Sequence, residues 1–481
     1  MLHAHRIRSM AALVPAAALL LALPVGAGEW SRFRGPNGSG VSKSTGLPVD
    51  FGPQKNKAWE ADVPFGRSSP AVSADRIFLT AVEDGKLITM SLDRKSGKIL
   101  WRKELERGHV AEFYPSTDSA TPTPVTDGSN VFAFFHEAGL VSYDRAGKQR
   151  WRVSLGPFRN YYGIASSPVL AGDTLFLLCD QAQGSFLLAV DKNSGKELWR
   201  RNRPARLESY STPILYPDAA EPRLVVVSGS RWVDAYDVAT GKNLWALGGV
   251  GSGPIASPVL VGDTLFVSAQ DHTEDGWASF SELLKEHDAN KDGSLAKAEL
   301  EGSWMIKHFG WIDTDASGVI TADDWERLSH EMVNDNWGVF AIRVPAGEGQ
   351  PEILWNYRKG VPNVPSPLVH GDVFYMVKDG VVTSLESRTG KLLKRGRLGS
   401  GSPKVYASPV AADGKIFIGT LDGHVAVLEA GSEWTVLAMN DLGDEIWASP
   451  AISEGHVYVR TKGKLYNFVS GAKPAAAKAA P

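Results

Sequence analysis

A short segment that ends in Ser-Pro or Thr-Pro recurs along almost the whole chain at a nearly constant spacing. Its prolines are Pro70, Pro122, Pro168, Pro213, Pro258, Pro367, Pro409 and Pro450. Most intervals are 41 to 52 residues, and the interval between Pro258 and Pro367 is longer by about the length of a small domain. Such a fixed period is typical of repeat proteins, whose units bury their apolar faces against neighbouring units. The chain therefore contains eight similar units and one insertion.

Each unit repeats the same order of apolar runs and turns. The unit at Pro168 continues through a Gly172-Asp173 turn to the apolar run 174–178, and a third run covers 186–190. The turn Ser194-Gly195-Lys196 then leads to a fourth run, which includes Trp199. Short apolar runs between Gly and Asp turns predict strands, and four strands in about 45 residues are a propeller blade. We therefore expect an all-β, eight-bladed β-propeller.

A turn that contains Gly, followed by Trp, closes most units. The tryptophans at this position are Trp101, Trp151, Trp199, Trp245 and Trp355. The sixth unit keeps the turn Thr389-Gly390-Lys391 without a Trp, and in the seventh unit Trp434 is displaced. An indole on an outer strand can lie between neighbouring sheets and donate its N–H to a backbone carbonyl of the next blade. We expect these tryptophans to stabilise the fold rather than to perform chemistry.

The eighth unit lacks its fourth strand, and a segment near the N-terminus can supply it. Residues 56–63, which include Trp59, resemble that missing strand. Pairing of this segment with the C-terminal strands would close the ring and remove the exposed sheet edges. The predicted domains are an N-terminal extension over 28–55, propeller blades over 56–270 and 338–470, and an insertion over 271–337.

The repeats resemble the tryptophan-docking motif of the quinoprotein propellers, the pyrroloquinoline quinone type. Ala189-Val190-Asp191 and Ser194–Trp199 resemble the motif closely, as does Ala235–Trp245. This family includes quinone-dependent alcohol dehydrogenases and non-catalytic relatives such as the propeller subunit of the outer-membrane β-barrel assembly machinery. Trp30 and the stretch Phe33–Gly38 also resemble the start of secreted quinoprotein-like propellers. The resemblance implies the fold more strongly than it implies any function.

The residues of this chain favour the non-catalytic kind of relative. The resemblance implies that a dehydrogenase holds its quinone against a vicinal disulfide, and Cys179 is the only cysteine here. No Cys-x-x-Cys-His sequence is present to attach a c-type haem. We expect a non-catalytic binding or scaffold protein without pyrroloquinoline quinone. The alternatives are a pyrroloquinoline quinone-dependent oxidoreductase, similar to alcohol dehydrogenase, and a protein that binds carbohydrate or another polymer.

The insertion contains two stretches that fit the twelve-residue calcium loop of an EF-hand. The expected ligands of the first loop are Asp288, Asn290, Asp292, the Ser294 carbonyl and Glu299, and those of the second are Asp313, Asp315, Ser317, the Val319 carbonyl and Asp324. Leu295, at position 8 of the first loop, can pair with its counterpart in the second. Asp324 replaces the usual Glu at position 12, so we expect weaker binding there, or tolerance of magnesium.

These loops predict that one or two Ca²⁺ ions are bound. We expect helices over 277–287, 296–310 and 323–333, with one helix that leaves the first loop and enters the second. A structural clamp is favoured over a calcium switch, because a weak site outside the cytoplasm would stay filled. The alternative interpretation is a pair of acidic turns without a metal.

The repeat also predicts a possible ligand site at the propeller face that carries the insertion. The residue three places before each repeated proline should approach the central channel, which gives Arg67, Tyr210, Tyr406 and Trp447 among the apolar Ala165, Ile255 and Val364. These side chains could bind a protein or a small-molecule or polymer ligand, or they could pack at the channel rim. The run Arg200, Arg201, Arg203 and Arg206 favours a solvated loop over an anion site.

The two ends of the chain suggest export. A polar start, an apolar run from Met10 to Leu23 and Val25-Gly26-Ala27 indicate a signal peptide over 1–27. A periplasmic or secreted protein without a transmembrane segment after processing is expected. The tail 471–481 is rich in Ala, Lys and Pro, and we expect it to be disordered. The net charge of −3 gives no reason to expect nucleic acid as a partner.

Overall fold

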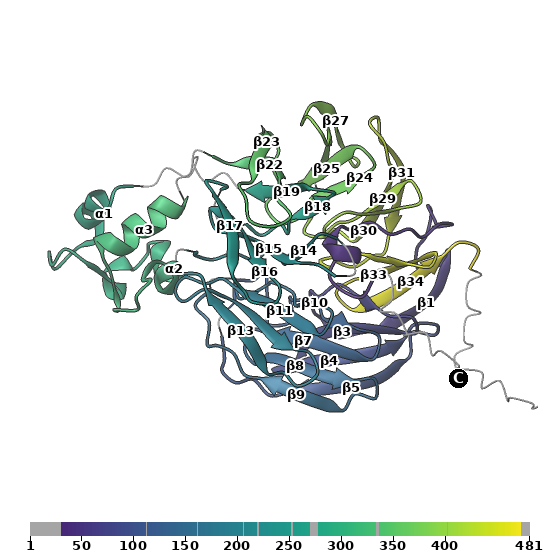
Figure 1. Ribbon diagram of the computed structural model, residues 1–481, viewed down its shortest axis with the longest axis horizontal. Helices are drawn as coiled ribbons and strands as arrows, with labels where there is room; N and C mark the ends of the chain where they lie inside the picture. The colour runs from purple at the N-terminus through teal and green to yellow at the C-terminus, as the bar shows by residue number, and fades with distance from the viewer. Residues whose placement is uncertain are drawn as a thin grey trace, which may run out of the picture.

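Eight four-stranded antiparallel sheets form a closed β-propeller in the computed structural model (Figure 1). The structure describes residues 30–472 except 112, 161, 205, 219–220, 252–253, 270–277, 333–335 and 402. The predicted signal peptide and residues 473–481 of the predicted tail lie outside the described residues. The eight-bladed fold that the repeat predicts is therefore confirmed.

The first four blades follow one another without interruption. Blade 1 consists of β2 (Ala71–Val72), β3 (Arg76–Glu83), β4 (Lys86–Asp93) and β5 (Ile99–Leu105). Blade 2 consists of β6 (Val125–Thr126), β7 (Asn130–Phe135), β8 (Gly139–Asp144) and β9 (Gln149–Val153). Blade 3 consists of β10 (Val169–Ala171), β11 (Thr174–Cys179), β12 (Phe186–Asp191) and β13 (Glu197–Asn202). Blade 4 consists of β14 (Ile214–Tyr216), β15 (Leu224–Gly229), β16 (Trp232–Asp237) and β17 (Asn243–Gly248).

The second half of the ring contains the insertion and the closure. Blade 5 consists of β18 (Val259–Val261), β19 (Thr264–Ala269), β22 (Gly338–Arg343) and β23 (Glu352–Tyr357). Blade 6 consists of β24 (Leu368–His370), β25 (Val373–Lys378), β26 (Val381–Glu386) and β27 (Leu392–Arg397). Blade 7 consists of β28 (Val410–Ala412), β29 (Lys415–Gly419), β30 (His424–Glu429) and β31 (Thr435–Asp441). Blade 8 consists of β32 (Ala451–Ser453), β33 (His456–Arg460), β34 (Lys464–Val469) and β1 (Lys57–Asp62).

The N-terminal strand β1 closes the ring by pairing antiparallel with the C-terminal strand β34, as the sequence predicts. The register places Glu60 opposite Tyr466 and Asp62 opposite Lys464. Lys464 also contacts the carboxylates of Glu60 and Asp62 at 3.2 and 2.6 Å. Blade 8 thus contains one strand from the N-terminal part of the chain and three from the C-terminal part. The ring is closed by this pairing, which leaves no open sheet edge at the junction.

The burial of each strand follows from its place in the blade. The two middle strands are covered on both faces by neighbouring blades, so their sequences are continuous apolar runs. In β11, for example, Leu175 to Cys179 are all buried. Cys179 is a buried free thiol, as expected, and burial raises its pKa. The fourth strands alternate exposed and half-buried residues because they form the outer edge.

Five tryptophans dock between blades in the way that the sequence predicts. Their Nε1 atoms donate to backbone carbonyls of the following blade at 2.9 to 3.1 Å, and each indole lies on a glycine of that blade. The pairs are Trp59 on Gly97, Trp101 on Gly147, Trp151 on Gly195, Trp199 on Gly241 and Trp355 on Gly390.

Two further tryptophans depart from this arrangement. Trp245 is buried, but its Nε1 atom has no hydrogen-bond partner, because the closing segment 344–351 of blade 5 lacks the short Gly-Lys turn. In blade 6, Lys394 occupies the position that holds Trp in most of the other repeats. The displaced Trp434 of blade 7 packs back onto Gly396 of blade 6, with Lys394 Nζ 4.9 Å from its ring. The missing indole is thus replaced from the neighbouring blade.

The N-terminal extension runs across one end of the central channel. Trp30 and Ser31 accept hydrogen bonds from the inner strands of blades 1 and 2, and Gly40 accepts one from Ala411 of blade 7. Asn37 exchanges two hydrogen bonds with Leu215 of blade 4. A short 3-10 helix (Pro36–Gly38) lies between these contacts. Because the segment contacts blades on opposite sides of the ring, it closes this end of the channel.

A small helical insertion lies between β19 and β22, beside the propeller (Figure 1). It contains α1 (Phe280–His287), a 3-10 helix (Lys297–Leu300), α2 (Met305–Ile312) and α3 (Ala322–Met332), with the short strands β20 (Leu295–Ala296) and β21 (Val319–Ile320). Nine buried apolar residues, among them Trp325 and Phe309, form its own core. Trp277, where the sequence predicts the first helix to begin, lies outside the described residues.

The connection between the two acidic loops differs from the expectation of one continuous helix. The helix that leaves the first loop ends at Leu300, and α2 begins only at Met305. Gly302 between them has a φ of 84°, a left-handed conformation that an α-helix cannot contain. The prediction of a single helix over 296–310 was therefore wrong.

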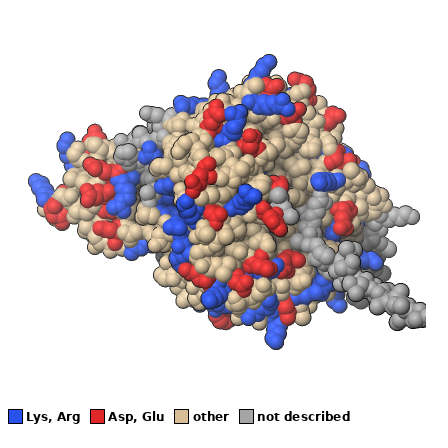
Figure 2. All heavy atoms as spheres, viewed as in Figure 1, with Lys and Arg blue, Asp and Glu red and all other residues tan. Residues whose placement is uncertain are grey.

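The face of the molecule seen in Figure 2 carries no large patch of a single charge. Acidic and basic side chains are interspersed on the face shown in Figure 2. Of the helices that the structure describes, none has the length and apolar character needed to cross a membrane.

Candidate functional site

A pocket of about 320 Å³ lies in the central channel and is surrounded by all eight blades. Each blade contributes the residue three places before its repeated proline, and these are Arg67, Thr121, Ala165, Tyr210, Ile255, Val364, Tyr406 and Trp447. The four predicted funnel residues and the three apolar ones all line this pocket. We call this pocket the funnel.

The eighth lining residue, Thr121, shows that the repeated proline of blade 2 is not the one predicted. The sequence Thr121-Pro122-Thr123-Pro124 offers two prolines two residues apart, and the prediction used Pro122. In the structure Pro124 is the repeated proline, because β6 begins directly after it, as β2 begins directly after Pro70. The strand register therefore places Thr121, rather than Ser119, at the funnel.

A closed ring of hydroxyl groups lines the funnel below these residues. In every blade the residue before the repeated proline donates its backbone N–H to the hydroxyl oxygen of the equivalent residue in the next blade, at 2.8 to 3.1 Å. The members, which we call the hydroxyl ring, are Ser69, Thr123, Ser167, Thr212, Ser257, Ser366, Ser408 and Ser449. The Ser or Thr before each proline recurs in the sequence, but its role in this ring was not predicted.

Aromatic side chains form two groups around the funnel. Tyr406 and Trp447 are stacked, with ring centroids 5.0 Å apart and planes 8° apart, and the Arg67 guanidinium lies 4.6 Å from the Trp447 ring. Tyr162 contacts Tyr114 and Tyr210 edge to face at 5.1 and 5.4 Å. Tyr114 and Tyr162 come from loops between blades. Their part in the funnel was not predicted, since no fixed distance from a repeated proline marks them.

The predicted funnel residues differ in how accessible they are. Tyr210 is 7% exposed, and its hydroxyl donates to Glu208 at 2.9 Å, so burial raises its pKa well above the usual value. Arg67, Tyr406 and Trp447 are half-buried, and Arg67 forms an ion pair with Asp118. A ligand would therefore meet Tyr406 and Trp447 more readily than Tyr210.

Three buried arginines lie next to the hydroxyl ring. Arg34 donates to the carbonyls of Pro367 and Pro409, which directly follow two ring members, and Arg32 donates to the carbonyl of Pro213, which follows a third. Arg460 donates to the Ser68 carbonyl and hydroxyl beside Ser69.

Burial lowers the pKa of these guanidinium groups, to about 9 for Arg34 and about 10 for Arg32 and Arg460. None of the three forms an ion pair with a described acidic residue within 4.0 Å. The three arginines therefore place positive charge beside the hydroxyl ring, although Asp218 and Asp118 partly offset the effect of burial on the pKa of Arg32 and Arg460.

The predicted solvated arginine run is only half correct. Arg200 and Arg201 are exposed on the outer strand, as expected. Arg203 is 3% exposed and bonds to Asp180 and Asp234, each at 2.8 Å, and Arg206 bonds to Asp234 at 2.8 Å. These two arginines cross-link blades 3 and 4 inside the protein. The sequence does not show this because the acidic partners lie 23 to 31 residues away.

The two acidic loops of the insertion lie side by side and are joined by the β20–β21 pair, in which Leu295 stands opposite Ile320. This is the pairing of the two position-8 residues that the sequence predicts. Both loops also hold their first aspartate in the same way. Asp288 accepts from the N–H groups of Asp292 and Gly293, and Asp313 accepts from those of Ser317 and Gly318, at 3.0 to 3.2 Å.

The carboxylates at position 12 are held equivalently as well. Glu299 accepts from the N–H groups of Ala289 and Ala296, and Asp324 accepts from those of Thr314 and Thr321, at 2.8 to 3.1 Å. Burial alone would raise the pKa of Asp324, but hydrogen bonds from Thr314 and Thr321 outweigh it and lower the pKa.

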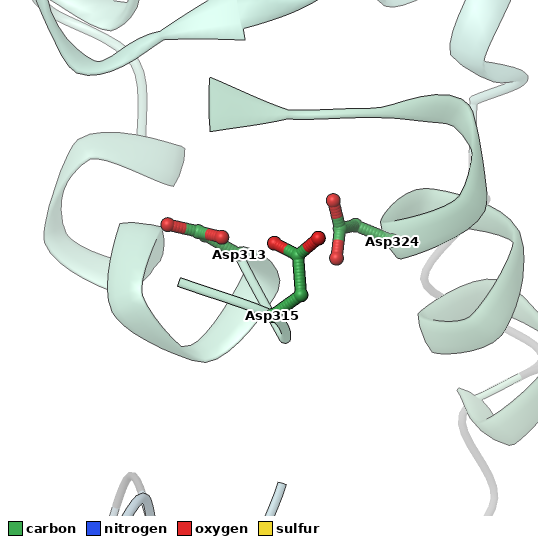
Figure 3. Close-up of side chains that lie close together, drawn as sticks. All are labelled: Asp313, Asp315 and Asp324. Atoms are coloured by element: carbon green, nitrogen blue, oxygen red, sulfur yellow. The ribbon is translucent and has the colours of Figure 1, made fainter. Parts of the chain in front are cut away.

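The acidic side chains come together most closely in the second loop. One oxygen from each of Asp313, Asp315 and Asp324 lies within 4.8 Å of the others, and no other such acidic group was found among the described residues (Figure 3). The Val319 carbonyl accepts from the Ser317 hydroxyl at 3.0 Å. In the first loop Asn290 and Ser294 both donate to Asp292, which lowers its pKa. Carboxylate, hydroxyl and carbonyl oxygens in this arrangement are ligands that suit calcium.

Solved structures share the fold of the chain. The crystal structure of BamB from Moraxella catarrhalis is 15% identical, covers 86% of this chain and 99% of its own, and gives a TM-score of 0.55. A europium-containing methanol dehydrogenase is 11% identical, covers 94% of this chain and 99% of its own, and gives a TM-score of 0.60. At these identities the likeness concerns the fold alone.

The relatives found by sequence comparison are BamB proteins rather than dehydrogenases. The outer membrane protein assembly factor BamB of Burkholderia pseudomallei is 26% identical over 221 residues, which span 44% of this chain and about half (53%) of that relative. The BamB of Shewanella oneidensis is 22% identical over 416 residues, 81% of this chain and 92% of that protein. The profile of the family described as outer membrane protein assembly factor BamB matches residues 54–148, 137–276 and 348–473, well over half of the chain. The chain therefore belongs to the BamB family of β-propeller proteins.

Proposed function

We propose that this protein is an exported, non-catalytic member of the BamB family that binds a ligand or partner at the funnel. The insertion acts as a calcium-loaded EF-hand pair on the same face of the propeller. Within the envelope or outside the cell, the protein serves as a binding or scaffold component rather than as an enzyme.

The convergence of eight equivalent positions on one pocket carries this proposal. Arg67 is the one charged side chain among the described residues that line the funnel. The lining is otherwise made of aromatic, aliphatic, hydroxyl and amide groups. Such a lining can bind and orient a ligand, but it offers neither the carboxylate pair nor the activated nucleophile that hydrolytic or proton-transfer chemistry needs. A lined pocket without these groups supports binding.

The calcium assignment is supported by the equivalence of the two loops. In both, the carboxylates at positions 1 and 12 accept from N–H groups at the same loop positions. Among the described residues, the acidic oxygens lie within 4.8 Å of one another only in the second loop, which therefore supports the assignment more strongly. The side chains of Asp313, Asp315 and Asp324 and the Val319 carbonyl would hold one ion. Those of Asp288, Asp292 and Glu299, with Asn290 and the Ser294 carbonyl, would hold a second. Both ions would clamp the insertion rather than act as a switch.

The positions of the insertion and the funnel on the propeller support a shared function of these two sites. The insertion connects the second and third strands of blade 5, and Arg159 of the segment between blades 2 and 3 donates to the Thr314 carbonyl at 3.4 Å. The segments between blades also carry the funnel residues. A large partner at the funnel would therefore also contact the insertion.

Two measurements on the mature chain test this function. With calcium, pyrroloquinoline quinone and a range of alcohols and sugars, we expect no dye reduction, and turnover would instead support the oxidoreductase alternative. A binding screen against glycans and envelope proteins should yield a ligand whose binding is lost in Tyr406→Ala and kept in Leu198→Ala, which changes an exposed residue of the outer strand. Ligands that bind both variants equally would contradict a role for the funnel.

A further inference from the structure

We propose that the funnel binds the acidic end of a saccharide chain, with the carboxylate of a sugar acid held at the hydroxyl ring. This inference rests on the proposed role of the funnel as the ligand site and names the class of ligand. It follows from four properties of the pocket. These are its hydroxyl donors, the positive charge beside it, the closure of one end of the channel, and a wall that contains both aromatic and polar side chains.

The hydroxyl ring is rich in donors. Each hydroxyl oxygen already accepts the backbone N–H of the preceding blade, as between Ser408 and Ser366 at 3.0 Å. A hydroxyl group has one proton to donate, and this bond leaves that proton available. Eight such groups face one pocket, so the ring offers many O–H donors. A carboxylate, which only accepts hydrogen bonds, matches this surface.

The charge around the ring favours an anion. Arg32, Arg34 and Arg460 are buried beside it, and each donates to carbonyl or hydroxyl oxygens rather than to a described carboxylate. Arg34 is fully buried, and its Nε and Nη1 atoms have no hydrogen-bond partner. Among the described lining residues there is no Asp or Glu. Asp218 and Asp118 act on Arg32 and Arg460 from beyond ion-pair distance, and Asp118 also pairs with Arg67, but no described acidic group acts on Arg34. Its positive charge can attract an acidic group, because the buried surroundings screen it little.

The closed end of the channel restricts how a ligand enters. The segment Trp30–Ser42 crosses one end of the channel and bonds to blades on opposite sides of the ring, and Phe33 from this segment lines the pocket. The funnel consequently has its mouth at the face of the insertion. A volume of about 320 Å³ suits a small molecule or the end of a chain. A polymer would enter by its end.

The wall favours a sugar over a flat aromatic acid. Tyr406 and Trp447 stack on each other, and Tyr162 meets its two neighbours edge to face, so these contacts create no slot between parallel rings. Polar groups such as Ser116, Thr117 and Asn363 lie among the aromatic ones. A sugar ring presents C–H and O–H groups side by side, and this mixed surface can contact both kinds of residue.

Calorimetry on the mature, calcium-loaded chain tests the proposal. The probe is trigalacturonate, and the matched control is the same trisaccharide with its carboxylates reduced to alcohols. We expect the acid to bind at least about tenfold more tightly than the reduced form, because charged hydrogen bonds are stronger than neutral ones. Added salt should weaken binding of the acid only. Benzoate, acetate and inorganic phosphate should bind more weakly than the acid, because they lack the sugar ring.

Variants then connect the binding to the funnel. Tyr406→Ala removes a half-buried ring and should weaken trigalacturonate binding at least about tenfold without loss of fold. Ser408→Ala removes one hydroxyl of the ring and should weaken it by a smaller factor. Ser166→Ala is the control, because Ser166 precedes a ring member but does not line the pocket. Melting curves show whether each variant is folded.

The proposal fails if the reduced trisaccharide binds as tightly as the acid, or if benzoate binds more tightly than the acid. It also fails if the folded protein shows no binding at millimolar trigalacturonate. If the screen described above finds another ligand that Tyr406→Ala abolishes, the funnel remains the binding site and only the sugar-acid assignment falls. If no ligand depends on Tyr406, the proposed function falls as well.

Discussion

The indole of Trp59 lies against Gly97, so closely that a Cβ atom on Gly97 would be 2.5 Å from Cε3 of the indole. Trp59 belongs to the strand that closes blade 8, and Gly97 belongs to the last turn of blade 1. The indole also donates to the carbonyl of Arg94 at 3.0 Å. This contact joins the two blades at which the ring closes, and it depends on the absence of a side chain at one residue.

Gly97→Ala should therefore destabilise the propeller. The new Cβ would displace the indole, and the φ of 73° at this position disfavours any side chain, so we expect a loss of about 2–4 kcal/mol. Gly85→Ala is the matched control, because Gly85 has a φ of 76° but no atom within 4 Å of the new Cβ. It should lose about 1 kcal/mol from backbone strain alone. Equal losses in thermal or urea unfolding would contradict the docking role of Trp59.

Comparison of two tryptophans measures how much the docking hydrogen bond contributes to the free energy of unfolding. Trp199 donates to the Val238 carbonyl at 3.1 Å, whereas Trp245 is buried without a partner for its Nε1 atom. Substitution by Phe keeps most of the apolar contact in both cases, but only Trp199→Phe leaves a carbonyl without its donor. Trp199→Phe should therefore be the more destabilising by about 1 kcal/mol in the free energy of unfolding. The opposite order would show that the hydrogen bond contributes nothing.

The adjacent residues Ser166 and Ser167 test the hydroxyl ring. Ser167 accepts the N–H of Thr123 at 3.0 Å, and Ser166 is buried with no partner for its hydroxyl. Ser167→Ala would leave a buried N–H unsatisfied and should cost about 1–3 kcal/mol. Ser166→Ala removes a polar group that has no partner, so it should be neutral or slightly stabilising. Thermal unfolding of the two variants compares them directly, and a costly Ser166→Ala would contradict this account.

The sequence predicts those parts of the structure that depend on a repeated spacing. Distances along the chain predicted the eight blades, the ring closure and seven of the eight residues that lie three before the repeated prolines. They also predicted the Trp contacts, except that Trp245 does not form the expected hydrogen bond. Blade 2 was misplaced by two residues because Thr121-Pro122-Thr123-Pro124 fits the repeat in two ways, and only the strand that follows decides between them.

Features that depend on distant or unrepeated residues could not be predicted. The burial of Arg203 requires Asp180 and Asp234, which lie in other strands, and nothing in the run of arginines indicates them. Likewise, the closure of the channel by the N-terminal extension depends on contacts of Asn37 and Gly40 with blades 4 and 7. A single glycine, Gly302, divides the helix that the apolar pattern predicts as continuous.

Stability should decrease in acid because of His136. This side chain is 2% exposed, its Nδ1 atom accepts the N–H of Ile164 at 2.9 Å, and burial together with His109 lowers its pKa to about 4. The unfolded chain binds a proton near pH 6.5 and the folded chain only near pH 4. Stability is therefore complete above pH 6.5 and is lost as the pH falls towards 4, by up to about 3 kcal/mol.

His136→Asn tests this assignment, because Asn retains an acceptor but does not titrate. The variant should show a smaller loss of stability between pH 6.5 and 4 than the natural protein when the free energy of unfolding is measured against pH. If both proteins lose the same amount, groups other than His136 cause the acid sensitivity.

Calcium should stabilise the insertion through Asp324. Asp324 is 2% exposed and its carboxylate lies with those of Asp313 and Asp315, so Asp324→Asn removes a charged ligand from the centre of the second loop. We expect calcium to raise the melting temperature of the natural chain, and we expect the variant to bind the second ion at least about tenfold more weakly. Asp323→Asn is the matched control, because Asp323 is exposed at the start of the same helix and is not an expected ligand. Calorimetric titration with calcium distinguishes the two variants. If calcium leaves the melting temperature unchanged, or if both substitutions weaken binding equally, Asp324 is not a ligand.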